Sequence, residues 1–126
     1  FLFDIDNFKQ ANDSCGHAFG DFCIKEFTSI IRKHFRADDV LGRIGGDEFA
    51  VFLSAPDGGW IEGKAKELSQ ALQVTCEKEN KSWSMSASIG VSIAPGAGAD
   101  FDTLYQNADE ALYQTKQRGK NGYTIV

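Results

Sequence analysis

Acidic side chains gather in two short stretches of this chain that could together hold a divalent cation. Residues 43–49 read RIGGDEF, so Asp47 and Glu48 stand side by side after two glycines. The chain begins FLFDID, which places Asp4 at the end of an apolar run and Asp6 two positions later. Carboxylates at strand ends are exposed yet rigidly held, and Mg²⁺ in proteins typically takes one or two of them together with substrate phosphates.

If the two stretches converge, they predict a metal site for a polyphosphate ligand, and the Gly-Gly turn would let that ligand approach the backbone closely. The alternative is structural. Asp4 and Asp6 would then only begin a helix, and Asp47 and Glu48 would only polarise a turn.

Composition limits the partners of the chain. Its 126 residues, 42% apolar and 25% charged, are typical of one soluble globular domain. The net charge of −5 argues against binding to nucleic acid or to an anionic membrane, so a polyphosphate would need cations as a bridge. Three cysteines without CxxC spacing argue against disulfides or zinc and indicate the reducing cytoplasm. No apolar run could span a bilayer, and no signal peptide is visible.

The predicted elements have the order β-α-α-β-β-α-β-α-β. This order indicates an α+β fold, with a largely antiparallel central sheet of about five strands and helices packed on one side. The Gly-Gly dipeptide predicts a hairpin turn with positive φ, and Asp21 and Asp102 are the expected N-caps of two helices. The expected strands are 1–5, 40–44, 49–53, 84–94 and 122–126; the helices are 7–14, from 21 onward, 60–79 and 102–117; the loops are 16–20 and 55–59.

Four sequence blocks carry a resemblance to a known family. RIGGDEF at 43–49 resembles the signature of the diguanylate cyclase catalytic domains, which are named GGDEF domains. DIDNFKQANDSCGHAFGD at 4–21, SASIGVS at 86–92 and NADEALYQTKQRGKN at 107–121 resemble further blocks in family order. The resemblance covers essentially the whole chain, 1–126, as one GGDEF-type domain. It implies that the domain's N-terminal segment is missing and that a sensory module lies upstream in the parent chain.

The family implies a fold like the palm of nucleotide cyclases and polymerases. It also implies the condensation of two GTP molecules into cyclic di-GMP and two pyrophosphates across a homodimer in which each domain holds one GTP. The resemblance places two Mg²⁺ ions, with Mn²⁺ as a possible substitute, between Asp4, the carbonyl of Ile5 and Asp47. It makes Glu48 essential, either as metal support or in deprotonating the 3′-hydroxyl. For Asp6, the choice between site residue and helix cap stays open.

Nucleotide contacts follow from the same match. Asn12 and Asp21 match the guanine-recognising pair, although Asp21 could instead cap its helix. Lys120 stands where the family usually has Arg, which keeps the charge but loses the bidentate fork. The remaining matched or candidate contacts to substrate are the backbone of Asn7, Phe8 (whose side chain could equally belong to the core), Lys9, Gly45, Gly46 and Lys116.

The stretch RADD at 36–39 carries a second signal. Arg36 and Asp39 match the family's RxxD pattern for an inhibitory site that binds cyclic di-GMP; the alternative is a surface ion pair. A non-catalytic module that binds GTP or cyclic di-GMP is the alternative function, and a cyclase with another product is a third. The intact Gly45–Phe49 stretch favours an active cyclase.

Overall fold

The computed structural model of the chain describes residues 1–54 and 58–126. Its elements in chain order are β1 (Leu2–Ile5), α1 (Phe8–Cys15), α2 (His17–His34), β2 (Val40–Arg43), β3 (Glu48–Phe52), the 3₁₀ turn η1 (Gly58–Trp60), α3 (Ile61–Ala71), β4 (Val74–Lys78), β5 (Lys81–Met85), β6 (Ala87–Val91), α4 (Phe101–Gln117) and β7 (Gly122–Ile125). None of the described helices is both long and apolar enough to cross a membrane.

A five-stranded sheet with the order β2-β3-β1-β6-β7 forms the centre of the molecule. Its neighbouring strands run antiparallel, except that β6 and β7 are parallel. The α+β class and the largely antiparallel sheet are therefore confirmed. Because β1 lies in the middle, its end is flanked on both sides: Asp4 is in register with Glu48 of β3 and with Ser88 of β6.

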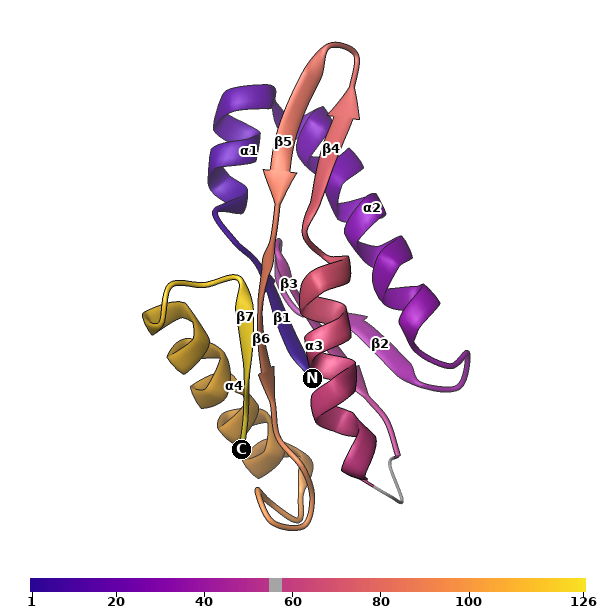
Figure 1. Cartoon of the computed structure of the whole chain (residues 1–126), viewed down its shortest axis with the longest axis vertical. Coiled ribbons are helices and arrows are strands. Elements are labelled where there is room, and N and C mark those ends of the chain that lie inside the picture. Colours follow the sequence, from indigo (N-terminus) through magenta and orange to yellow (C-terminus); the bar gives the residue numbers. More distant parts are fainter. Residues whose placement is uncertain (55–57) are drawn as a thin grey trace.

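Helices cover both faces of this sheet, so the expectation of helices on one side is wrong. Phe3 of β1 packs with Phe27 of α2 in the larger core cluster. Leu2 points to the other face and packs with Ala108 and Leu112 of α4. Figure 1 shows α4 on one side of the sheet and α2 and α3 on the other. All five residues of β6 are buried, and a strand buried on both faces requires a cover on each.

The first two helices meet at one glycine rather than across a loop. Gly16 has a φ of 89°, and its N–H donates to the carbonyl of Asn12, which closes α1. The next helix begins at His17, so the predicted loop at 16–20 is wrong. Asp21 lies inside α2, and its predicted role as an N-cap is wrong as well.

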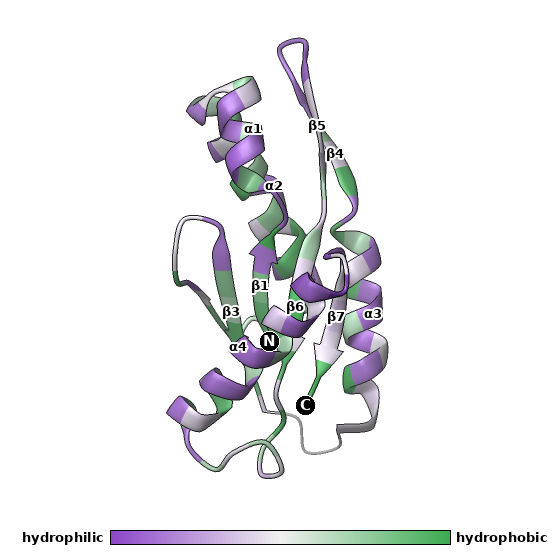
Figure 2. Cartoon of the chain, turned by 90° about the vertical axis from the view of Figure 1, so that its left-hand side faces the viewer, coloured by the Kyte–Doolittle hydropathy of each residue, from purple (hydrophilic) through white to green (hydrophobic). Residues whose placement is uncertain are grey.

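A hairpin replaces the end of the third predicted helix. That helix stops at Ala71, and β4 and β5 pair with each other around Glu79 and Asn80. Both turn residues have positive φ, 51° and 66°, as a tight two-residue turn requires. The hairpin projects beyond the main sheet and ends in a hydrophilic tip (Figures 1 and 2). The strand predicted at 84–94 is accordingly divided between β5 and β6.

Two further boundaries differ from expectation. The N-cap of α4 is Asp100 rather than Asp102, because the Asp100 carboxylate accepts a hydrogen bond of 2.9 Å from the N–H of Thr103. The loop predicted at 55–59 lies partly outside the described residues, and Gly58 and Gly59 belong to η1.

Gly90 sets the distance between α4 and the sheet, and its replacement should destabilise the fold. A Cβ at this position would lie 2.2 Å from the carbonyl oxygen of Ala108 and 2.4 Å from the nitrogen of Leu112. We expect Gly90→Ala to lower the free energy of unfolding by about 1–3 kcal/mol or more, because helix backbone must shift. Thermal and urea denaturation measure this loss.

Gly63 of α3 is the matched control, since nothing lies within 4 Å of a Cβ built there. Gly63→Ala should stabilise the chain by about 0.5–1 kcal/mol through its helix propensity. Equal stability of Gly90→Ala and the parent chain would contradict the close approach of α4.

Candidate functional site

The two acidic stretches meet at the end of β1. The N–H of Ile5 donates to the carbonyl of Asp47 at 3.0 Å, and Asp4 is in register with Glu48 on β3. The side chains of Asp4, Asp47 and Glu48 are all half-buried. The structure therefore brings the sequence-predicted carboxylates together at one end of the central strands of the sheet.

A lysine of α4 partly balances the negative charges of these carboxylates. The Nζ of Lys116, in the last turn of α4, forms an ion pair with Oδ2 of Asp4. Burial raises the pKa of Asp4, the negative charge of Asp47 adds to the rise, and Lys116 opposes it without reversing it. For Lys116, burial acts to lower its pKa, but the bond to Asp4 outweighs burial and raises it. The end of β1 is thus a place where anionic oxygens attract a cation.

The donors at this position suit a hard divalent ion. Asp4 and Asp47 supply carboxylate oxygens, the ligand type that Mg²⁺ prefers. In the described part of the chain, no group of three or more His, Cys, Asp or Glu side chains is arranged for a metal. A cation here would therefore need backbone carbonyls, water or ligand oxygens to complete its shell, which is the usual situation for Mg²⁺ with a phosphate ligand.

Tyr105 contacts the site, although the sequence analysis did not identify it. Its hydroxyl donates to Oε1 of Glu48 at 3.4 Å. Burial raises the pKa of Tyr105, and the Glu48 carboxylate adds to the rise. Tyr105 precedes Lys116 by three turns of α4 and so lies on the same helix face. Helical periodicity measured from Lys116 could have identified it.

The hairpin that carries Asp47 is held by a residue that the sequence analysis also missed. The guanidinium of Arg43 donates to the carbonyls of Gly45 at 3.1 Å and Gly46 at 2.7 Å, and it lies over the ring of Phe49. Neither glycine has a φ in the left-handed region, so the expectation that this turn demands positive φ is wrong. A Cβ on Gly46 would meet nothing within 4 Å. These glycines instead leave bare backbone at the hairpin tip.

The loop after β1 meets the loop after α4. The Nζ of Lys120 donates to Oδ1 of Asn7 at 2.7 Å. The side chain of Phe8 is buried and packs edge-on against Trp83, so only its backbone is placed to contact a ligand. Lys9 is exposed on α1. Asp6 is not a helix cap, since Asn7 occupies the N-cap position of α1.

Asn12 and Asp21 come from neighbouring helices that pack against each other. A Cβ on Gly20 would lie 1.9 Å from Oδ1 of Asn12, so the amide rests directly on the Gly20 backbone. Gly20 thus permits the contact that brings Asn12 beside the turn of α2 that carries Asp21. Asp21 is exposed, and because it lies inside α2 its side chain does not cap the helix.

Arg36 and Asp39 precede β2, at the opposite end of that strand from the β2–β3 turn that carries Asp47. Oδ2 of Asp39 accepts from the backbone N–H of Arg36 at 2.8 Å, and the N–H of Asp39 donates to the Arg36 carbonyl at 3.1 Å. Within residues 1–54 and 58–126 the two side chains form no ion pair, so the surface ion-pair alternative is wrong. The turn is held by its backbone, which leaves the guanidinium exposed.

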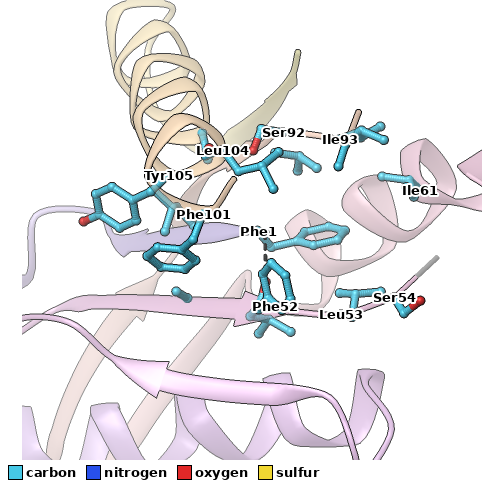
Figure 3. Close-up of a pocket in the computed structure, with 16 residues that line it drawn as sticks. Phe1, Phe52, Leu53, Ser54, Ile61, Ser92, Ile93, Phe101, Leu104 and Tyr105 are labelled. Atoms are coloured by element: carbon cyan, nitrogen blue, oxygen red, sulfur yellow. Dashed lines mark hydrogen bonds between the residues drawn. The ribbon is translucent and has the colours of Figure 1, made fainter. Parts of the chain in front are cut away.

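An apolar cavity lies at the start of β1, away from Asp4 and Asp47. Its volume is about 420 Å³, and it is lined mainly by apolar residues from the start of β1, from β3 and β6, and from α4. Figure 3 shows Phe1, Phe52, Phe101 and Leu104 around it. No charged side chain contributes to the lining that the structure describes. Asp4, Asp47 and Lys116 do not line this cavity, although Tyr105, whose hydroxyl contacts Glu48, does.

Comparison with known proteins agrees with this geometry. The sequence profile of the family described as "Diguanylate cyclase, GGDEF domain" matches residues 1–122. The chain belongs to the GGDEF diguanylate cyclase family. It is 39% identical over 124 residues to the bifunctional diguanylate cyclase/cyclic di-GMP phosphodiesterase MucR of Pseudomonas aeruginosa, covering 95% of this chain and 18% of MucR.

A second relative and a solved structure support the same membership. Diguanylate cyclase DgcS of Shewanella oneidensis is 38% identical over 132 residues, which cover 98% of this chain and 40% of DgcS. The GGDEF domain of DgcB from Caulobacter crescentus, solved in complex with c-di-GMP, superposes with a TM-score of 0.89. The match to DgcB has 27% identity and covers 98% of this chain and 74% of that one. The GGDEF chain therefore spans less than half the length of these two curated relatives.

Removing Lys116 should shift the titration of Asp4. Because the ammonium favours the ionised carboxylate, Lys116→Met is expected to raise the pKa of Asp4 further above its ordinary value. NMR titration of the side-chain carboxyl carbons measures the shift. Lys120→Met is the matched control, since Lys120 bonds to Asn7 instead. An Asp4 pKa that is the same in the parent and in Lys116→Met would show that the ion pair does not form in solution.

Proposed function

We propose that this domain condenses two GTP molecules into cyclic di-GMP and two pyrophosphates. The observation that carries the proposal is the paired carboxylates of Asp4 and Asp47 at the end of β1, with Lys116 beside them. Membership of the GGDEF family and the names of the cyclase relatives support it. The 3′-hydroxyl of each GTP would attack the α-phosphate of the other.

Divalent cations would be held by Asp4, Asp47 and the carbonyl of Ile5, with Mg²⁺ as the natural ion and Mn²⁺ as a substitute. Two such ions can stabilise both the entering and the leaving oxygen of an in-line displacement. Lys116 and Lys120 would balance the charge of the triphosphate, and the backbone of Asn7 and Phe8 and the bare tip at Gly45 and Gly46 would make room for it. Glu48, which accepts from Tyr105, would support the cations or take the hydroxyl proton.

Guanine would be recognised by Asn12 and Asp21. A carboxylate accepts from both N1–H and the 2-amino group of guanine, and adenine offers neither. Because α2 begins at His17, the side chain of Asp21 is not needed as an N-cap and is available for this contact.

Each domain would supply half of an active site, so a homodimer is the expected active state and an upstream module would control its assembly. Product would bind at Arg36 and Asp39 and inhibit from outside the metal site. In the turn, one oxygen of Asp39 accepts the Arg36 N–H, which leaves the other oxygen and the exposed guanidinium for guanine.

Asp47→Ala should abolish synthesis and leave the fold intact. Loss of a cation ligand removes several kcal/mol of stabilisation of the transition state, so we expect at least about a 100-fold lower rate with Mg²⁺ and GTP. Chromatography of the products measures it. Asp102→Ala, an exposed position on α4, is the control and should match the parent. Synthesis at the parent rate by Asp47→Ala would refute the metal assignment, and GTP binding without product by the parent would favour the non-catalytic alternative.

Asp21→Ala should relax the preference for GTP over ATP. A hydrogen bond to a charged group contributes about 1.5–3 kcal/mol, so loss of the Asp21 carboxylate corresponds to roughly a tenfold change or more in selectivity. Competition binding with both nucleotides measures this ratio. Since Asp21 is exposed and does not cap α2, the melting temperature should stay near that of the parent. A lower melting temperature with unchanged selectivity would contradict the guanine assignment.

Arg36→Ala should remove product inhibition without lowering the initial rate. The substitution keeps the backbone N–H that bonds to Asp39, so the turn should persist. Asp39→Ala would break the turn and is the less informative variant. Calorimetric titration of cyclic di-GMP into parent and Arg36→Ala chains tests the site, and equal affinity would rule it out.

A further inference from the structure

Asp6 is a buried carboxylate that the proposed function does not use. Only 6% of the residue is exposed. Its Oδ1 accepts from the hydroxyl of Ser88 at 2.6 Å, and its Oδ2 accepts from the hydroxyl of Ser86 at 2.7 Å and from the backbone N–H of Asn121 at 2.9 Å. No Lys, Arg or His of the described residues pairs with it. Three uncharged donors from β6, its flank and the loop after α4 therefore satisfy both oxygens of this carboxyl group.

The loop after α4 has a run of positive φ values. Gly119, Lys120 and Asn121 have φ values of 108°, 64° and 49°, so three successive residues lie in the left-handed region. This region is disfavoured for residues with a Cβ. The end of α4 holds the first two residues, since the N–H of Gly119 donates to the carbonyl of Lys116 at 3.3 Å and that of Lys120 to the carbonyl of Thr115 at 3.1 Å. The N–H of Asn121 donates instead to Asp6.

The same loop carries Lys120. Its ammonium bonds to Asn7, the residue after Asp6, so residues 6–7 and 120–121 are joined by two hydrogen bonds. One turn of α4 earlier, Lys116 pairs with Asp4. The end of α4 thus fixes the backbone of Lys120 on one side, and the contacts to residues 6–7 fix its side chain and the following residue on the other.

We propose that Asp6 is a positioning residue that fixes the loop of residues 119–121, and through it Lys120, for contact with the triphosphate. The inference rests on the proposed function, because the triphosphate is part of that function. Asp6 acts as an acceptor for the Asn121 N–H and not through its charge, which distinguishes it from Asp4 and Asp47.

Titration of a non-hydrolysable GTP analogue with Mg²⁺ tests this role, with GMP as the control ligand that lacks the distal phosphates. Asp6→Ala should bind the GTP analogue about tenfold more weakly, which is the effect of losing the bond from the Lys120 ammonium to a distal phosphate, and should bind GMP as the parent does. Lys120→Ala should show the same loss. The double variant should lose no more than either single one, because both act through one contact.

Asp6→Asn is the matched conservative variant. Its amide oxygen can accept from the Asn121 N–H, and its amide nitrogen can donate to the hydroxyl of Ser88, since a hydroxyl both donates and accepts. Affinity for the GTP analogue should therefore stay near that of the parent. A large loss in Asp6→Asn would indicate that the charge itself matters, as for a metal ligand, and would overturn the inference.

Amide exchange in the parent chain keeps the proposal testable if Asp6→Ala fails to fold. The Asn121 N–H should exchange much more slowly than a free amide, and exchange at the free rate would overturn the inference. Failure of the parent to bind the GTP analogue would overturn the proposed function itself. Equal binding of the analogue by parent and Asp6→Ala would overturn only the role of Asp6.

Discussion

Repulsion between two carboxylates at the end of a buried strand is the constraint on which this site depends. Burial is the larger cause of the raised pKa of Asp4, and the negative charge of Asp47 adds to the rise because partial burial weakens the screening by water. A neighbouring cation is therefore needed to balance these negative charges. Lys116 in the last turn of α4 supplies part of this positive charge. Burial and repulsion still outweigh the lysine, since the pKa of Asp4 remains raised. The remaining demand for positive charge is what makes the place suitable for divalent cations.

The packing of α4 makes this balance possible. Gly90 lets the helix backbone lie directly against β6, and Leu2, Ala108 and Leu112 fill the space beside it. This contact aligns one face of α4 with the end of β1, so that Tyr105 reaches Glu48 and Lys116 reaches Asp4. A packing requirement in the core thus sets the electrostatics of the site.

Sequence patterns predicted the central sheet well, because its strands are short apolar runs bounded by glycine or acidic residues. They also predicted that the two acidic stretches belong to one site. They failed where one residue changes the backbone direction. The left-handed Gly16 lets α2 begin at His17, four residues before Asp21, the expected cap. The turn at Glu79 and Asn80 makes a hairpin in a region whose sequence pattern predicts helix and strand. Contacts such as Lys120 with Asn7, 113 positions apart in the chain, depend on tertiary geometry that no local pattern reports.

Left-handed backbone recurs at the two loops that meet beside the end of β1. Asn7 has a φ of 55°, and Gly119, Lys120 and Asn121 follow one another in the same region. Such conformations are narrow wells, and the hydrogen bonds between the loops keep the chain in them. The ordering entropy of these loops is therefore already lost on folding, before any ligand arrives. A ligand that binds between them would meet a preorganised surface, and more of its contact energy would remain as affinity.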